Sequence, residues 1–155
     1  MTSAHPPSAS FLICRSNQRL CALPLEHVAE TMRPLALETL PDMPHFLLGV
    51  SIIRGAAVPV VSAAKLAGGA AATPPTRYVT LKLGERRVAL AVESVIGVRV
   101  LPLGSLEEIP PLLRELDGNA VAAITTLDAE LLLVLQGARL IPEQVWDAID
   151  AKRLL

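Results

Sequence analysis

GVSIIRGAAVPVVSAAKL, residues Gly49 to Leu66, predicts the architecture of this 155-residue chain more directly than any other part of the sequence. Two apolar runs, Val50–Ile53 and Ala57–Val61, meet at a single Arg-Gly pair. β-branched residues are typical of strands, and Gly55 can adopt the positive φ that a tight reversal requires. The pattern therefore predicts a β-hairpin whose apolar strands carry one charged side chain, Arg54, at their turn.

A second copy of the surrounding pattern occurs later in the chain. Residues 11–30 align with residues 78–97 without a gap, and most aligned pairs keep their apolar character. The hairpin itself aligns with residues 118–140 when three residues are inserted at the turn, which places Arg54 opposite Thr125. One unit of about 60 residues is therefore used twice.

Each unit predicts about five short strands, which cannot bury both faces of a sheet alone. Closing such a set into a small barrel would remove its exposed edges, and packing two barrels together would bury more apolar area. We therefore expect a mainly all-β chain with two five-stranded barrels. Its predicted parts are a flexible tail at 1–9, a first subdomain at about 10–67, a linker at 68–76, a second subdomain at about 77–141 and a C-terminal helix within 142–155.

Two cysteines, Cys14 and Cys21, lie in the first predicted strand pair. If Asn17 and Gln18 form a two-residue turn, the two thiols fall opposite each other on neighbouring strands. Their spacing matches neither a zinc site nor a thioredoxin motif, and two cysteines do not make the disulfide framework of a secreted protein. We interpret them as reduced core residues of a cytoplasmic protein, with a redox pair as the alternative.

The composition argues against several classes of function. A net charge of −1, a pI near 6.3 and only 3% aromatic residues disfavour nucleic-acid binding, which needs a basic stripe or stacking platforms. Apolar residues make up 52% of the chain, and its mean hydropathy is +0.48. No stretch has the pattern of a membrane helix or a secretion signal, so we expect no membrane insertion. The surplus apolar surface is interpreted as facing partner proteins.

Candidate catalytic and metal-binding groups are scattered along the chain. The three histidines show no ligand spacing, so no metal site is predicted. Two carboxylate pairs, Glu107 with Glu108 and Asp128 with Glu130, fall in predicted loops, and Ser62 has no neighbouring base. A glycine-rich phosphate loop is also lacking. We therefore predict neither an enzyme nor a cofactor site.

Three residues, Arg54, Val28 and Glu30, are each compatible with two interpretations. Arg54 is a solvated turn residue on statistical grounds, but an arginine amid apolar neighbours is also a typical hot spot for protein binding. Val28 and Glu30 combine a core-type and a polar side chain in a segment, 26–33, that fits either a short helix or a strand.

Three segments of the chain resemble the CheW family of chemotaxis adaptor proteins. They are ALPLEHVAE (Ala22–Glu30), LPDMPHFLLGVSIIRGAAVPVV (Leu40–Val61) and RYVTLKLGERRVALAVESVIGV (Arg77–Val98). The most specific pieces are Leu-Pro-x-x-Pro at 40–44, Gly-Val-x-x-x-Arg-Gly at 49–55 and Val-Pro-Val-Val at 58–61. The resemblance extends from about Phe11 to Leu140 and implies two SH3-like five-stranded β-barrels, in agreement with the repeat.

The resemblance implies a non-enzymatic adaptor in the cytoplasm, recruited to membrane-associated receptor arrays. Such an adaptor would couple the signalling tip of a chemoreceptor to the regulatory domain of a CheA-type histidine kinase. Other CheW-like proteins are a further class of implied partner. A scaffold or decoy that binds these partners without activating a kinase is the alternative.

The resemblance also assigns residues to the two interfaces. The receptor-binding positions are Val28, Glu30, Gly49 and Arg54. There a helical receptor tip would lie in an apolar groove, and the arginine would bind a carboxylate or carbonyl oxygen. Contact with the kinase would use the barrel edges, with Ile52 and Val58 as candidates.

Three positions depart from the family pattern. An asparagine that is common before the Arg-Gly turn is replaced by Ile52, and two aspartates are replaced by Ser62 and Glu93. We expect the loss of the asparagine and of the first aspartate to remove hydrogen bonds that fix the turn and the following helix, each worth about 1 kcal/mol. The fold should tolerate this loss, whereas partner choice could shift to an alternative array that does not control flagellar swimming.

Overall fold

The computed structural model describes residues 7–66, 73–108 and 120–153, and ten β-strands dominate these ranges. The strands are β1 (Ser8–Ser16), β2 (Arg19–Pro24), β3 (Val28–Met32), β4 (Leu47–Ile53), β5 (Ala56–Ser62), β6 (Arg77–Leu83), β7 (Arg86–Val92), β8 (Ser94–Pro102), β9 (Val121–Leu127) and β10 (Glu130–Leu135). The other elements are the 3₁₀ turns η1 (Leu25–His27), η2 (Leu103–Ser105) and η3 (Gly137–Arg139) and the helices α1 (Ala63–Leu66) and α3 (Glu143–Arg153). The expected mainly all-β fold class is confirmed.

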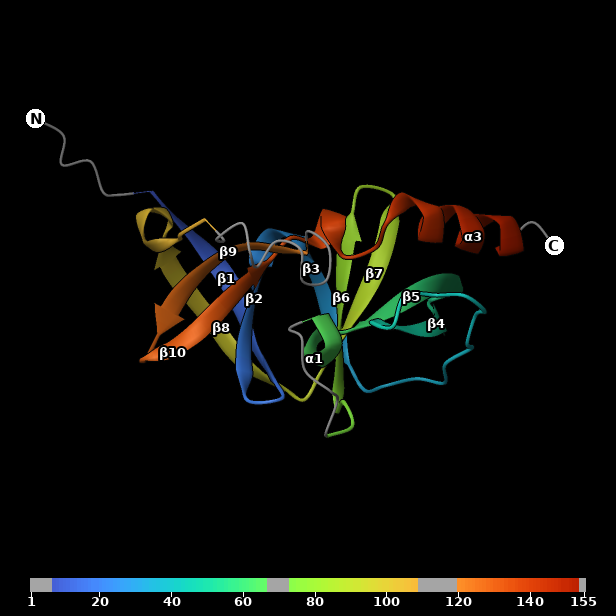
Figure 1. Ribbon diagram of the computed structural model, residues 1–155, viewed down its shortest axis with the longest axis horizontal. Coiled ribbons are helices and arrows are strands. Elements are labelled where there is room, and N and C mark those ends of the chain that lie inside the picture. Colours follow the sequence, from blue (N-terminus) through green and yellow to red (C-terminus); the bar gives the residue numbers. More distant parts are fainter. Residues whose placement is uncertain (1–6, 67–72, 109–119, 154–155) are drawn as a thin grey trace, which may run out of the picture.

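The strands form two five-stranded sheets that lie side by side (Figure 1). We call the sheet with the order β8-β1-β2-β10-β9 sheet A, and the sheet with the order β3-β6-β7-β5-β4 sheet B. Neighbouring strands are antiparallel except for the parallel pairs β2–β10 and β5–β7. Each sheet therefore combines the first hairpin of one repeat with three later strands of the other.

This exchange differs from the expected assignment of each barrel to one continuous half of the chain. Hairpin β1–β2 belongs to the first repeat but pairs with strands of the second, and hairpin β6–β7 does the reverse. The subdomains expected at about 10–67 and 77–141 are thus intertwined. A hydrophobic pattern reports which face of a strand is buried, whereas the choice of neighbouring strand leaves no local pattern.

β1 begins at Ser8, inside the segment expected to be a flexible tail, because Ser8 and Ala9 pair with β8. Residues 68–72 of the expected linker lie outside the described residues. The ambiguous segment 26–33 begins within η1 and continues as β3.

Tight two-residue turns close three of the hairpins. Both central residues have positive φ: 53° and 66° at Asn17-Gln18, 50° and 79° at Arg54-Gly55, and 50° and 66° at Asp128-Ala129. Such φ values are those of a type I′ turn, whose twist matches that of the strands. The first turn places Cys14 opposite Cys21, as predicted, and both are free thiols. Burial raises the pKa of each to about 12, which keeps them in the unreactive thiol form.

The turn of the second repeat, Asp128-Ala129, lies within residues 126–130, where the sequence alignment placed it, but the residue that corresponds to Arg54 is not Thr125. Thr125 lies inside the β9–β10 ladder, and the apex residue that corresponds to Arg54 is Asp128. Isolated bridges support this equivalence, because each repeat has one that joins a preceding glutamate to the first strand of the hairpin. They are Glu38 with Val50 and Glu107 with Ile124.

The principal core lies between the two sheets and is completed by α3, which lies beside the sheet that contains β6 and β7 (Figure 1). Val145, Trp146 and Ile149 of α3 pack on this core, as predicted for the C-terminal helix. Arg86 anchors the helix from β7, through an ion pair of 2.6 Å to Glu143 and a position 4.9 Å above the Trp146 ring. No helix in the described ranges is long and apolar enough to cross a membrane.

Gly49 lies where β4 passes the connection that follows β3. Its φ is 147°, and the pairing of β4 with β5 shifts register beside it. A Cβ atom at this position would lie 2.5 Å from the carbonyl oxygen of Glu38. Glu38 and Val50 exchange two backbone hydrogen bonds of 2.8 Å, so the connection cannot move away without breaking them. The backbone therefore requires glycine here.

We expect Gly49→Ala to lower the free energy of unfolding by about 2–4 kcal/mol, because the added methyl group must displace hydrogen-bonded backbone. Urea unfolding followed by circular dichroism measures this change. Gly104→Ala is the matched control, since a Cβ atom there meets nothing within 4 Å. Its expected effect is below about 0.5 kcal/mol. Equal stability of the two variants would contradict the steric role of Gly49.

Candidate functional site

An arginine–carboxylate pair joins the two edges of sheet B. Nε of Arg54 donates to Oε1 of Glu30, and Nη2 donates to Oε2, both at 2.8 Å. Glu30 lies on β3 and Arg54 lies at the turn that ends β4, and β3 and β4 are the opposite edge strands of the sheet. This two-point interaction, which we call the clamp, therefore connects the beginning and the end of the strand order.

A cleft of about 260 Å³ lies beside the clamp. Its lining residues are Ala29, Glu30, Ile53, Arg54, Val58, Thr80 and Arg87. Ile53 and Val58 belong to the inner core of sheet B and give the cleft an apolar floor. Thr80 fixes the backbone of Glu30, because its hydroxyl accepts from the Glu30 N–H at 3.1 Å and donates to the Glu30 carbonyl at 3.2 Å. Glu30 is thus fixed at its backbone by Thr80 and at its carboxylate by Arg54.

The clamp is an ion pair at the protein surface. The side chain of Arg54 is 67% exposed and that of Glu30 is 30% exposed. The hydrogen bonds from Arg54 hold the pKa of Glu30 below its ordinary value, and attraction to Arg87 acts in the same direction. The same hydrogen bonds raise the pKa of Arg54. Because both groups are ionised at neutral pH and reach solvent, a competing carboxylate can displace Glu30 at little cost in stability.

The predicted receptor-binding residues do not form one continuous surface. Glu30 and Arg54 are in direct contact, whereas Val28 packs against the principal core. The register of β3 shifts between Val28 and Glu30, so these two residues pair with consecutive residues of β6 and face opposite sides of the sheet. Gly49 contributes backbone geometry rather than a side chain. The structure therefore brings together only two of the four.

The predicted kinase-binding residues differ sharply in accessibility. Ile52 lies on edge strand β4 and is 60% exposed. Val58 is completely buried in the inner core of sheet B and lies at the floor of the cleft, so its side chain is not available for an edge contact with the kinase. The sequence could not separate them, because both are β-branched residues of one hairpin.

Two of the three departures from the family pattern form their own hydrogen bonds. Oγ of Ser62 accepts from the Lys65 N–H at 3.2 Å and caps α1, which corrects the expected loss of this bond. The Glu93 carboxylate accepts from the Asn17 N–H at 3.1 Å and supports the β1–β2 turn. Both replacements are therefore compatible with the local structure.

Two residues that line the cleft, Thr80 and Arg87, were missed by reasoning from sequence. Both belong to hairpin β6–β7, which was expected in the other barrel. A signal existed in β7, where Arg87, Ala89 and Ala91 alternate along one face, and the two alanines pack in the inner core of sheet B. That face meets Arg54 only because the hairpins are exchanged.

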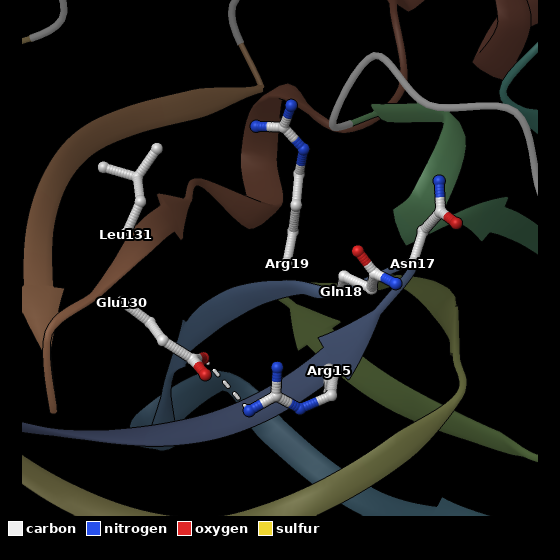
Figure 2. Close-up of a pocket in the computed structure, with 6 residues that line it drawn as sticks. All are labelled: Arg15, Asn17, Gln18, Arg19, Glu130 and Leu131. Atoms are coloured by element: carbon white, nitrogen blue, oxygen red, sulfur yellow. Dashed lines mark hydrogen bonds and ion pairs between the residues drawn. The ribbon is translucent and has the colours of Figure 1, made fainter.

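A wider depression of about 840 Å³ lies on sheet A, near the β1–β2 turn (Figure 2). Its lining residues are Arg15, Asn17, Gln18, Arg19, Glu130 and Leu131. Figure 2 shows Arg15 reaching toward Glu130, to which its Nη2 donates at 3.0 Å. Leu131 is the one apolar side chain of this lining. The cleft of sheet B, with its apolar floor, is therefore the better candidate for recognising another protein.

The residues around the cleft suit recognition rather than catalysis. The described lining contains no histidine, cysteine or serine, and the Thr80 hydroxyl is already bonded to the backbone of Glu30. A guanidinium group beside an apolar floor binds carboxylates, carbonyl oxygens and apolar side chains. We interpret the cleft as a protein-binding site.

Comparison with known proteins gives consistent results. The model of the CheW-like domain family matches residues 10–145. Protein FrzA of Myxococcus xanthus is 30% identical over 118 residues, which cover 75% of this chain and 71% of FrzA. A probable chemotaxis protein CheW of Rhizobium etli is 26% identical over 99 residues, which cover 63% of this chain and 64% of that protein. The crystal structure of the scaffolding protein TtCheW from Thermoanaerobacter tengcongensis shares the fold, with a TM-score of 0.73 and 21% identity over 88% of this chain and 90% of that one.

We expect an NMR titration to place the pKa of Glu30 below that of an ordinary glutamate, and to raise it toward the ordinary range in Arg54→Ala, where only the attraction to Arg87 still lowers it. Because the folded-state pKa is below that of the unfolded chain, the clamp stabilises the fold at neutral pH. This contribution disappears as the pH falls through the folded-state pKa. Glu143 is the control: its pKa is lowered by Arg86, and Arg54→Ala should not change it. An unchanged Glu30 pKa in the variant would disprove the clamp.

Proposed function

Because this chain belongs to the CheW-like domain family, we propose that it is a non-enzymatic adaptor of a chemosensory array. It couples the cytoplasmic signalling tip of a chemoreceptor to the regulatory domain of a CheA-type histidine kinase. The observation that carries the proposal is the clamp. Glu30 and Arg54, which the resemblance assigns to receptor binding, lie in direct contact beside a cleft with an apolar floor.

The clamp provides a simple way to bind the receptor. A helix of the receptor tip lying over the cleft would place a carboxylate or carbonyl oxygen near Arg54. Arg54 can then exchange its bond to Glu30 for a bond to the receptor, because exposed ion pairs contribute little to folding. The two-residue turn fixes the backbone of Arg54, so only its side chain has to move.

The kinase contact is proposed on a different surface. Ile53 lines the cleft, and its neighbour Ile52 leaves the edge strand β4 on the other side, since successive side chains of a strand alternate. An exposed apolar residue on an edge strand fits the edge of another β-barrel. Receptor and kinase could therefore bind at the same time, as coupling requires.

Two observations favour an array other than the one that controls flagellar swimming. Of the two sequence relatives named above, the one with the higher identity is FrzA rather than the protein named CheW. In addition, Ile52 replaces a family asparagine at the proposed kinase contact. The same replacement supports a second candidate function, a scaffold that binds receptors without activating a kinase.

We expect Arg54→Glu to weaken binding of a coiled-coil fragment of the receptor tip by at least about tenfold, because a cation is replaced by an anion that faces Glu30. Titration calorimetry measures the affinity. The melting temperature should change by no more than about 3 °C, since the pair is exposed.

The double variant Arg54→Glu/Glu30→Arg separates folding from binding. It restores an ion pair with its direction reversed, so its stability should equal that of the unmodified protein while its receptor binding stays weak. If binding returned together with stability, the clamp would be a purely structural device.

For the kinase contact, we expect Ile52→Asp to weaken binding of the kinase regulatory domain by about tenfold and to leave receptor binding within about twofold. Val100→Asp is the matched control, because Val100 is a β-branched residue that is 63% exposed on edge strand β8 of the other sheet. An equal loss in both variants would place the kinase contact elsewhere.

A reconstituted mixture of receptor, kinase and this protein distinguishes the two candidate functions. An adaptor raises the rate of kinase autophosphorylation, whereas a scaffold binds without raising it. Failure to bind either partner at tens of micromolar would exclude both, because modular contacts of this size reach about micromolar affinity.

A further inference from the structure

Arg87, which lines the cleft, and its neighbour Lys82 are two basic residues that the clamp does not use. Lys82 of β6 and Arg87 of β7 are directly opposite each other in the antiparallel β6–β7 ladder, so they leave the sheet on the same face. The next pair along that face, Thr80 with Ala89, leads into the cleft and the inner core of sheet B. Arg87 therefore lines the cleft, and Lys82 lies beside it on the same face of the sheet.

The charge of this pair is not balanced by the surrounding residues. The lining holds two guanidinium groups, Arg54 and Arg87, but one carboxylate, Glu30, and both oxygens of Glu30 accept from Arg54. The pKa of Glu30 is lowered chiefly by the hydrogen bonds from Arg54, and attraction to Arg87 through space acts in the same direction. Within residues 7–66, 73–108 and 120–153, neither the side chain of Lys82 nor that of Arg87 forms a hydrogen bond or an ion pair. The cleft is thus net positive.

This arrangement is unfavourable for the isolated protein. Like charges directly opposite each other on neighbouring strands destabilise a sheet. The chain as a whole has a net charge of −1 and 15 acidic residues, so its composition does not force two unpaired cations together. A carboxylate placed at the mouth of the cleft would remove the repulsion and would accept two parallel hydrogen bonds from Arg87.

We propose that Arg87, with Lys82 beside it, is a specificity-determining residue that binds an acidic side chain on the helical tip of the receptor. The inference rests on the proposed receptor-binding function of the cleft. A protein segment fits better than a small free anion, because the floor formed by Ile53 and Val58 offers an anion no further ligand and suits an apolar side chain. Arg54 and Arg87 then hold two different groups of the same partner.

Calorimetric titration with a coiled-coil fragment of the receptor tip, at 50 and 300 mM salt, tests the proposal. We expect Arg87→Glu to bind about tenfold more weakly than the unmodified protein, and Arg87→Gln about threefold more weakly. Both variants should show a smaller loss of affinity between the two salt concentrations, since one screened attraction is absent. The matched control is Arg99→Glu on β8, an exposed arginine of the other sheet, with an expected change below about twofold.

A charge exchange identifies the carboxylate. Each acidic residue of the fragment is changed to lysine in turn, and one of these fragments should bind Arg87→Glu at least as well as it binds the unmodified protein. If Arg87→Glu and Arg99→Glu bind the original fragment equally well, the role of Arg87 is refuted and the adaptor function stands. If the unmodified protein does not bind the fragment at all, both proposals fall. Circular dichroism of each variant verifies that the exposed substitutions leave the fold intact.

Discussion

The rest of the structure depends on two parallel strand pairings, β2 with β10 and β5 with β7. Each joins a hairpin of one repeat to the strands of the other, so neither five-stranded sheet can form from a single repeat. The principal core lies between the sheets and is complete only when both exchanges have taken place. The cleft depends on the same constraint, because the β5–β7 pairing carries Arg87 into the sheet that holds Arg54.

The two sheets share a framework but differ at their edges. In sheet B the edge strand and the opposing turn provide Glu30 and Arg54, which form the clamp. The equivalent positions in sheet A are Gly97 and Asp128, which cannot form an ion pair. The edge strand β8 instead exposes apolar side chains, Ile96, Val98 and Val100. The repeat therefore explains the fold, and the differences between its copies determine which end can recognise a charged partner.

Local sequence pattern and turn chemistry were sufficient to predict much of the fold. The reversal at Arg54-Gly55, the pairing of Cys14 with Cys21 and the C-terminal helix follow from local pattern and turn chemistry, and each is confirmed. The exchange of hairpins was not predictable, because burial specifies the face of a strand and not its neighbour. The site was predictable in part for the same reason. Resemblance pointed to Glu30 and Arg54, but their mutual bond and the presence of Arg87 follow from the tertiary pairing.

The intertwined sheets also imply something about the origin of this chain. One repeat contains a hairpin that can be donated and a set of strands that can receive one, so two separate copies could complete each other as a domain-swapped homodimer. The present chain has the strand arrangement of such a homodimer with its two subunits joined into one polypeptide. Once the two halves belong to one chain, their sequences can change independently. A symmetric dimer can in this way become a molecule with two different ends. The proposed function, an adaptor between two unlike partners, needs that asymmetry.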